Sequence, residues 1–151
     1  MYRILTILIL LHHMTSYSAY ANEVGDLEGR WRTVRHGALV EITDCGNGTP
    51  CATLFWANPT LLGDVKYDDR NRNKDLRNRP LIGVPIFWGF TPSKNGWGRG
   101  RLYNPDDGKT FRAFLRPLSA TELRVTGCLG PFCRSQTWLR IDTRKIQLNK
   151  Q

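Results

Sequence analysis

Short runs in which hydrophobic and polar positions alternate recur along most of the chain and are separated by turn residues. The clearest is Thr121–Cys128, where Leu123 and Val125 would face one side and Arg124 and Thr126 the other. Alternation of this kind is typical of β-strands with one buried face. The pattern predicts eight strands: Gly29–His36, Ala38–Asp44, Cys51–Ala57, Gly83–Phe90, Trp97–Tyr103, Lys109–Arg116, Thr121–Cys128 and Arg134–Asp142.

The gaps between most of these predicted strands have hairpin length and contain Gly, Pro, Asn or Asp. Such connections join neighbouring strands of an antiparallel sheet. A series of hairpin-linked strands can close into a barrel, and closure removes the exposed sheet edges. We therefore predict an all-β fold, an eight-stranded up-and-down antiparallel barrel, with a sandwich of two sheets as the alternative. A barrel of this size can hold packed side chains or one small ligand.

The connection Asn58–Pro80 is the exception, because it is long, polar and irregular. Six basic and four acidic residues lie between Asp64 and Arg79. Long loops of compact domains are often functional or disordered. Asp64 with Arg77 and Arg79 could order the loop over one end of the barrel, bind an anion or a ligand, or place Asp64 for catalysis. The plainest alternative is a solvated crossing between two strands.

The first 21 residues have the features of a secretory signal peptide. Arg3 provides a positive charge, Ile4–Leu11 is a short apolar run, and residues 19–21 fit the small-residue pattern of a cleavage site. The run is shorter than the about 20 residues that a membrane-spanning helix needs. We therefore predict cleavage near Ala21, a single β-barrel domain over residues 22–151, and a periplasmic or secreted protein without an integral membrane segment.

The chain is strongly basic, with a formal net charge of +9. A basic balance favours acidic partners. Here, however, the Lys and Arg residues are interspersed with Asp and Glu residues rather than gathered in one run. We therefore expect no nucleic-acid partner.

All four cysteines lie in the part of the chain that is predicted to be exported, where thiols oxidise. Cys45 and Cys51 bracket a Gly/Pro-containing turn, and so do Cys128 and Cys133. The spacing therefore favours two local disulfides, each within a hairpin, with cross-pairing between the hairpins as the alternative. The spacings do not match the paired ligands of zinc modules, and we expect neither a metal nor a cofactor.

Candidate catalytic groups are few. Beyond the predicted signal peptide His36 is the only histidine, and it adjoins a turn glycine. A serine or cysteine nucleophile would need it as a base, whereas a turn or surface position accounts for it more simply. The run Asp106–Thr110 lacks the first glycine of a phosphate-binding loop and indicates a hairpin turn. We therefore expect a protein that is not an enzyme.

Several short motifs follow one another in a fixed order. They are Gly29-x-Trp31, the hairpin Cys45–Cys51, Asp64, LRNRPLIG at 76–83, GRLYNPDDGKTF at 100–111, LRVTGC at 123–128 and QTWLR at 136–140. In this order they resemble the bacterial family called domain of unknown function 2147, although Ala52, Tyr67 and Phe111 depart from its pattern. The resemblance implies a small exported β-barrel of lipocalin type and no particular chemistry.

A looser resemblance is to the lipocalins, which open with Gly-x-Trp on the first strand and place an arginine of the last strand over that indole. Gly29, Trp31 and Arg140 stand at the matching positions of this sequence. The resemblance implies a cation–π contact that closes one end of the barrel. It gives structural roles to Gly29, Trp31 and Arg140, and we add Trp138, in the last strand, to them.

The aromatic residues are the last clue to function, because they could fill the core or line a small apolar cavity. We predict a non-enzymatic protein that binds a small apolar or amphipathic ligand in the bacterial envelope, gated by the loop Asn58–Pro80. The candidate ligand-binding residues are Asp64, Arg77, Arg79, Trp56, Trp88 and Phe90. The alternative is a protein-interaction module, such as an envelope enzyme inhibitor, and a third hypothesis is an enzyme acting through Asp64.

Overall fold

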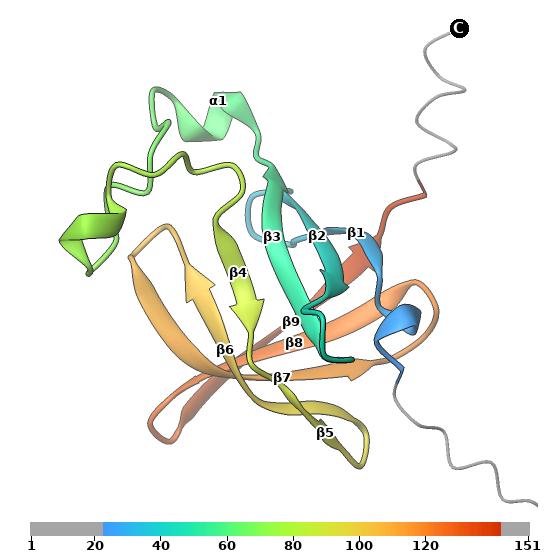
Figure 1. Ribbon diagram of the computed structural model, residues 1–151. Coiled ribbons are helices and arrows are strands. Elements are labelled where there is room, and N and C mark those ends of the chain that lie inside the picture. Colours follow the sequence, from blue (N-terminus) through green and yellow to red (C-terminus); the bar gives the residue numbers. More distant parts are fainter. Residues whose placement is uncertain (1–22, 143–151) are drawn as a thin grey trace, which may run out of the picture.

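The computed structural model describes residues 23–142, and the predicted signal peptide with its cleavage site near Ala21 lies outside the described residues. Strands dominate this part of the chain (Figure 1). They are β1 (Gly29–Arg32), β2 (Leu39–Asp44), β3 (Pro50–Trp56), β4 (Pro85–Trp88), β5 (Thr91–Ser93), β6 (Gly96–Asn104), β7 (Lys109–Pro117), β8 (Glu122–Leu129) and β9 (Phe132–Arg140). The short helices are η1 (Val24–Asp26), α1 (Pro59–Leu62) and η2 (Lys74–Leu76).

Hydrogen bonds join the strands in the order β4-β3-β2-β1-β9-β8-β7-β6-β5, and β4 pairs with β6 in addition. This pairing closes eight strands into a barrel, and β5 extends one end as a short hairpin with β6. All paired strands are antiparallel. The predicted eight-stranded up-and-down barrel is therefore confirmed and the two-sheet sandwich is excluded, while β5 is an additional strand that the alternation does not predict.

The first strand is shorter than its sequence pattern indicates. β1 ends at Arg32, whereas the pattern continues to His36. Residues 33–38 form a loop instead, in which the Thr33 amide donates to the Ala38 carbonyl over 2.8 Å. Gly37 has a φ of +58°, a left-handed conformation that suits glycine and turns the chain back into β2.

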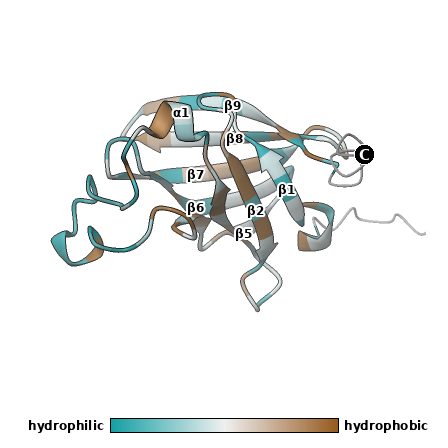
Figure 2. Cartoon of the chain, turned by 90° about the horizontal axis from the view of Figure 1, so that it is seen from above, coloured by the Kyte–Doolittle hydropathy of each residue, from teal (hydrophilic) through white to brown (hydrophobic). Residues whose placement is uncertain are grey.

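Because neighbouring strands run in opposite directions, their connections gather at two ends of the barrel. One end, called here the closed end, carries η1 and the β2–β3, β5–β6 and β7–β8 hairpins. The other, the open end, carries the β1–β2 loop, the β6–β7 and β8–β9 hairpins, and a long connection between β3 and β4, residues 57–84, called the excursion. The excursion is mostly hydrophilic and projects sideways from the barrel (Figure 2).

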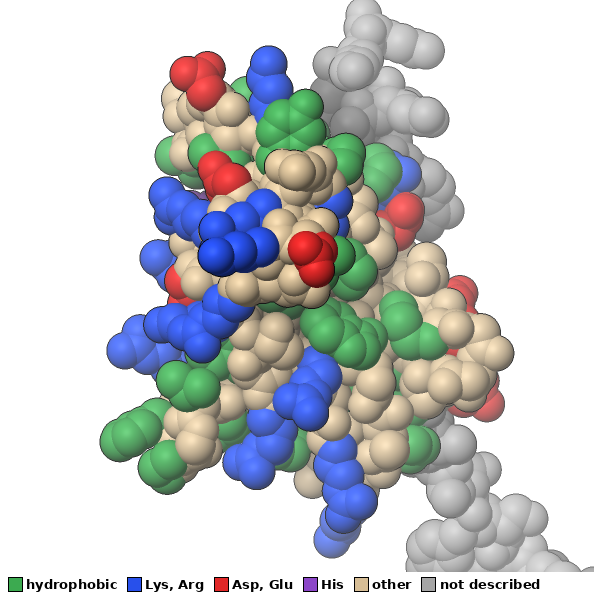
Figure 3. Space-filling view, turned by 60° about the vertical axis from the view of Figure 1, so that its left-hand side comes forward, with side chains coloured by type: hydrophobic (Ala, Val, Ile, Leu, Met, Phe, Trp, Pro, Cys, Tyr) green, Lys and Arg blue, Asp and Glu red, His purple; other side chains and the backbone are tan. Residues whose placement is uncertain are grey.

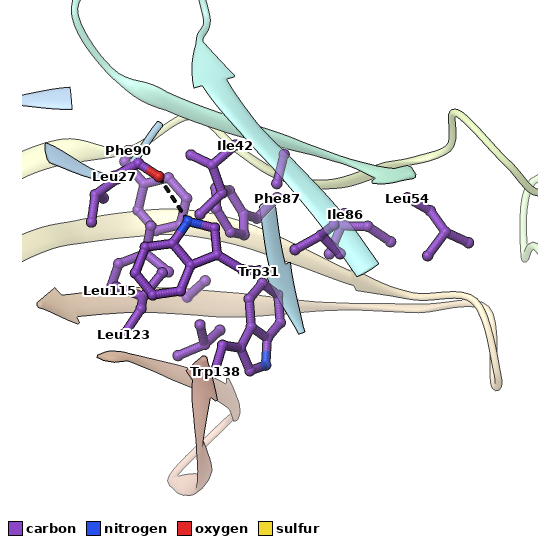
Figure 4. Close-up of a cluster of buried hydrophobic side chains, with 14 of the residues drawn as sticks. Leu27, Trp31, Ile42, Leu54, Ile86, Phe87, Phe90, Leu115, Leu123 and Trp138 are labelled. Atoms are coloured by element: carbon purple, nitrogen blue, oxygen red, sulfur yellow. Dashed lines mark hydrogen bonds between the residues drawn. The ribbon is translucent and has the colours of Figure 1, made fainter. Parts of the chain in front are cut away.

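The hydrophobic core lies inside the barrel, where buried side chains from most of the strands meet (Figure 4). Phe87 meets Phe90 edge-on, with ring centroids 5.4 Å apart, and stacks with Trp138 at 6.0 Å. Phe90 lies against the backbone of Gly100, where an added Cβ would come within 2.3 Å of the ring. A side chain at position 100 is therefore incompatible with this packing.

Both disulfides form within hairpins, so the local pairing predicted from the spacing is confirmed and the cross-pairing alternative is excluded. Cys45 and Cys51 join the ends of the β2–β3 hairpin at the closed end. Cys128 and Cys133 clip the β8–β9 hairpin at the open end. Within residues 23–142, none of the helices has the length and apolar character needed to span a membrane.

Candidate functional site

A cavity of about 580 Å³ opens at the open end of the barrel. Its volume lies within the range of about 300–1,000 Å³ that is usual for small-molecule sites. Its mouth is formed by the β1–β2 loop, α1 and the β6–β7 and β8–β9 hairpins. Apolar side chains line its inner part: Val40, Leu54, Ala57, Leu62, Leu81, Ile86, Leu102, Phe111, Val125 and Trp138.

Strand alternation explains which side chains of β9 face the cavity. Arg134, Gln136 and Trp138 occupy alternate positions, and all three line the cavity. Since β9 runs from the open end to the closed end, these residues form a series from the mouth to the floor. The Trp138 indole N–H donates to Oε1 of Gln136 over 3.3 Å, which orients the amide.

The paired positions of β8 also face the cavity. Val125 pairs with Gln136, and Gly127 pairs with Arg134. A Cβ at Gly127 would lie 3.1 Å from Cδ2 of Leu102 and 3.5 Å from Cβ of Phe111, two cavity-lining residues. Gly127 therefore faces inward, and Leu102 and Phe111 pack against its backbone.

One polar contact crosses the mouth. His36 lies in the β1–β2 loop and Asp106 lies in the β6–β7 hairpin, and the strand order puts these two connections on opposite sides of the ring. Nε2 of His36 nevertheless lies 2.8 Å from Oδ2 of Asp106, and a guanidinium nitrogen of Arg35 lies 3.9 Å from the same oxygen. The pair partly covers the opening.

The rim around this contact contains exposed apolar side chains. Phe132 is 80 % exposed at the start of β9, and Leu129 at the end of β8 and Leu61 in α1 are also exposed. All three line the cavity. The site therefore combines an apolar interior, a polar contact across the mouth and an apolar rim.

The excursion is held to the outside of the barrel by a buried polar cluster. Asp68 is only 1 % exposed, and its carboxylate accepts hydrogen bonds from Arg79 Nε at 2.9 Å and a second Arg79 nitrogen at 2.8 Å. The Asn71 amide donates to the same carboxylate over 2.7 Å, and the hydroxyl of Tyr103 donates to its other oxygen. Tyr103 belongs to β6, so the cluster joins the excursion to the barrel wall.

Electrostatics favour the protonated form of the tyrosine in this cluster. Burial raises the pKa of Tyr103 well above its ordinary value of 10, and the hydrogen bond and negative charge of Asp68 raise it further. The hydroxyl therefore remains a donor to Asp68 at physiological pH. The cluster is a structural anchor rather than a reactive pair.

The structure separates the three charged candidates of the excursion. Asp64 is exposed, and its carboxylate makes no hydrogen bond or ion pair to a described residue. Arg79 pairs with Asp68 and not with Asp64, while Nε of Arg77 donates to the Asn71 carbonyl over 2.7 Å. None of Asp64, Arg77 and Arg79 is among the cavity-lining residues. The part of the excursion that reaches the cavity is instead its beginning, with α1, and Leu81.

The sequence contains no signal that separates Asp68 from the neighbouring acidic residues, and the reasoning from sequence missed it. Its role depends on Tyr103, which lies 35 positions away on another strand. Lys and Arg side chains outnumber Asp and Glu side chains on the side where the excursion projects (Figure 3). Because basic residues surround every acidic residue of the excursion, the charge pattern of the sequence does not indicate which carboxylate is buried.

The three aromatic candidates do not line the cavity. Trp56 and Trp88 are exposed on the outside of the barrel, at 40 % and 36 %, and Phe90 is buried in the core. Trp56 faces outward because the register shifts at Phe55, so that Val40 pairs with Leu54 but Leu39 pairs with Trp56. The cavity wall is mainly aliphatic, and Trp138 lies on its floor.

The described residues contain no group of three or more His, Cys, Asp or Glu side chains that could hold a metal ion.

The chain is similar to one solved structure and matches one family model. It is similar to a solved structure described as "Protein HP1028 from the human pathogen Helicobacter pylori belongs to the lipocalin family", at 27 % identity, a TM-score of 0.68, and coverage of 82 % of this chain and 88 % of that chain. No curated protein matches the chain. Residues 29–140 match the family model described as "Uncharacterized protein conserved in bacteria (DUF2147)". The chain, a lipocalin-like barrel, therefore belongs to the DUF2147 family.

Proposed function

We propose that this protein is a non-enzymatic binding protein that carries a small apolar or amphipathic molecule inside its barrel. The observation that supports this function is the cavity of about 580 Å³, with its apolar interior and polar mouth. Moving an apolar ligand from water into such an interior is favourable by about 25 cal/mol per Å² of buried apolar surface. Trp138 on the floor stacks with buried Phe87, and a wall that is already packed before a ligand binds lowers the entropic cost of binding.

The disulfides and the family indicate where such a protein works. Disulfides form and persist in oxidising compartments, and both cysteine pairs are bonded. Together with a family found in bacteria, they point to a periplasmic or extracellular protein. We propose that the segment 1–21 directs export and that the mature barrel holds its ligand in the cell envelope or outside the cell.

Native mass spectrometry of the protein purified from its own envelope tests this function. A co-purifying small molecule should appear as an added mass that is released when the protein is denatured. The variant Gly127→Leu should lose the added mass, because the new side chain would displace Leu102 and Phe111, which line the cavity, and reduce its volume. The control Arg124→Leu adds an apolar side chain to an exposed position of the same strand and should retain it.

Equal loading of Gly127→Leu and the parent protein would contradict binding inside the barrel. Decanol, a small amphipathic molecule, serves as a probe if no added mass is found. If decanol also fails to bind the purified protein, the proposed function is contradicted. Circular dichroism of both variants confirms that each remains folded.

A second candidate is a protein-interaction module, and the exposure of Phe132 and Leu129 at the tip of a disulfide-clipped hairpin favours it. An exposed apolar tip on a rigid hairpin suits insertion into a partner. The two functions differ in their response to substitution. Phe132→Ser should abolish a partner complex formed through the tip, whereas Gly127→Leu should leave that complex intact.

A further inference from the structure

We propose that the cavity selects anionic amphiphiles, which enter tail first and place an acidic head group on Arg134 at the mouth. This proposal rests on the proposed function and names its ligand class. The ligand would be an alkyl chain that ends in a carboxylate or a similar singly charged acidic group.

Arg134 is placed to meet such a head group. It lines the cavity, it pairs with Gly127 across the β8–β9 ladder, and Gly127 faces inward. The position lies one residue from Cys133, whose disulfide holds the hairpin at the mouth. The missing side chain at Gly127 lets Leu102 and Phe111 pack against the strand beside Arg134.

Among the described residues, the charges that line the cavity are already paired except at Arg134. The Asp106 carboxylate contacts His36 at 2.8 Å and Arg35 at 3.9 Å. Asp107 and Lys109 lie 3.8 Å apart. The side chain of Arg134 makes no hydrogen bond, ion pair or ring contact with a described residue. An anionic ligand can therefore pair with Arg134 without displacing another carboxylate.

A second donor lies one step deeper. The Oε1 atom of Gln136 accepts the Trp138 indole N–H, which leaves the amide N–H groups of Gln136 for a ligand. Gln136 faces the cavity on the same side of β9 as Arg134. Two donor groups, one charged and one neutral, therefore stand in series on the path from the mouth to the floor.

The gradient of polarity along this path determines the orientation of the ligand. Below Gln136 the lining is apolar, with Trp138, Val125 and Ile86 at the inner end. A charge placed there would lose its water without a partner, which is unfavourable. The same charge beside the exposed guanidinium of Arg134 keeps water and gains an ion pair. The apolar chain therefore occupies the floor, and the acidic group remains at the mouth.

The test compares decanoate, decanol and decyltrimethylammonium by isothermal titration calorimetry on the full exported protein. The three ligands share their alkyl chain and differ only in the head group. Decanoate should bind about tenfold more tightly than decanol, the factor expected for one charge-assisted hydrogen bond at an exposed site, and decyltrimethylammonium should bind most weakly.

Arg134→Gln should remove the advantage of decanoate and leave the affinity for decanol unchanged. The matched control is Arg124→Gln, which removes the same charge from an exposed position of the neighbouring strand, one that does not line the cavity. It should preserve the preference for decanoate, which separates a local contact from a change in net charge.

Different outcomes separate this proposal from the function on which it rests. If decanol binds but decanoate binds no better, or if Arg134→Gln leaves the preference intact, the head-group proposal is wrong and the binding function stands. If none of the three ligands binds a folded protein, the binding function is contradicted and the head-group proposal falls with it. Thermal unfolding of both arginine variants verifies that each is folded.

Discussion

The guanidinium of Arg140 lies over the indole of Trp31, with its Cζ atom 4.4 Å from the ring centroid. Trp31 is 1 % exposed and donates its indole N–H to the Leu27 carbonyl over 2.8 Å. Arg140 in turn donates to the carbonyls of Asp26, Glu28 and Ala120. One side chain of the last strand therefore links the first strand, η1 and the β7–β8 hairpin, and it closes the end of the barrel that lies opposite the cavity mouth.

Replacing Arg140 with Met should lower the free energy of unfolding by about 2–4 kcal/mol. Hydrogen bonds to charged groups contribute about 1.5–3 kcal/mol each and a cation–π contact about 0.5–2 kcal/mol, and such contributions are not additive. Urea denaturation measures the loss. Because the residue lies at the closed end, decanol affinity of the folded variant should stay the same. A stability within error of that of Arg124→Met would show that these contacts contribute nothing.

The buried carboxylate of Asp68 should matter far more than the exposed carboxylate of Asp64. Asp68→Ala leaves the Arg79 guanidinium and the Tyr103 hydroxyl without their partner, so we expect a loss of about 3–5 kcal/mol, as for other broken buried ion pairs. Asp64→Ala should change stability by less than about 0.5 kcal/mol, as is usual for exposed positions. Denaturant unfolding of the two variants gives the comparison.

The same substitution should release the excursion from the barrel. In Asp68→Ala, limited proteolysis should cleave within residues 64–80 under conditions in which the parent protein and Asp64→Ala stay intact, because the hydrogen bonds that Arg79 and Tyr103 donate to Asp68 are lost. Equal protection of all three proteins would contradict the anchoring role of the cluster.

The contrast between Asp64 and Asp68 shows which features of the structure can be predicted from the sequence. Strand positions follow from alternation, which is a local property, and the barrel follows from hairpin-length connections. The inward or outward direction of Trp56 could not be predicted, because one extra residue at Phe55 reverses it. The role of Asp68 could not be predicted either, because it depends on a contact with a distant strand.

The site residues of β9 illustrate an intermediate case. Alternation in β9 puts Arg134, Gln136 and Trp138 on one face, which the sequence alone would allow. That this face is the inner one depends on pairing with Val125 and Gly127, and that a cavity remains above Trp138 depends on the volumes of side chains from every strand. Whether a cavity remains depends on how the side chains pack in three dimensions, so the sequence pattern does not predict it.

The β2–β3 hairpin should contribute stability that depends on pH. The Asp44 carboxylate accepts hydrogen bonds from the amides of Gly46 at 2.8 Å, Asn47 at 3.1 Å and Gly48 at 2.9 Å. These bonds, the one from Gly46 first, lower the pKa of Asp44 below its ordinary value of 3.8, and partial desolvation opposes them. A lowered folded-state pKa means that the carboxylate stabilises the fold above the unfolded value and that this contribution is lost as the pH falls through the folded value.

Thermal unfolding followed from neutral to strongly acidic pH tests this coupling. The parent protein should lose more stability in the acid range than Asp44→Asn, because the amide cannot change its charge. The control Asp69→Asn, at an exposed position of the excursion, should retain the acid profile of the parent protein. Superimposable profiles for the parent protein and Asp44→Asn would mean that the turn amides do not hold the charged form.

The contact between His36 and Asp106 should control access to the cavity more than stability. The two side chains are 46 % and 38 % exposed, and exposed ion pairs contribute about 0–1 kcal/mol to folding. Because the pair partly covers the opening, breaking the contact should speed the entry and the exit of a ligand. Asp106→Asn should raise the association and dissociation rates of decanol by about two- to fivefold, the factor for about 0.5–1 kcal/mol, with little change in Kd.

Stopped-flow measurements with decanol test this gate. Asp107→Asn is the matched control, since Asp107 lies on the same hairpin and pairs with Lys109 beside it rather than with a residue across the mouth. It should leave both rates unchanged. If decanol enters and leaves Asp106→Asn at the rates of the parent protein, the contact between His36 and Asp106 does not limit access to the cavity. If only the Kd changes, Asp106 contacts the ligand directly.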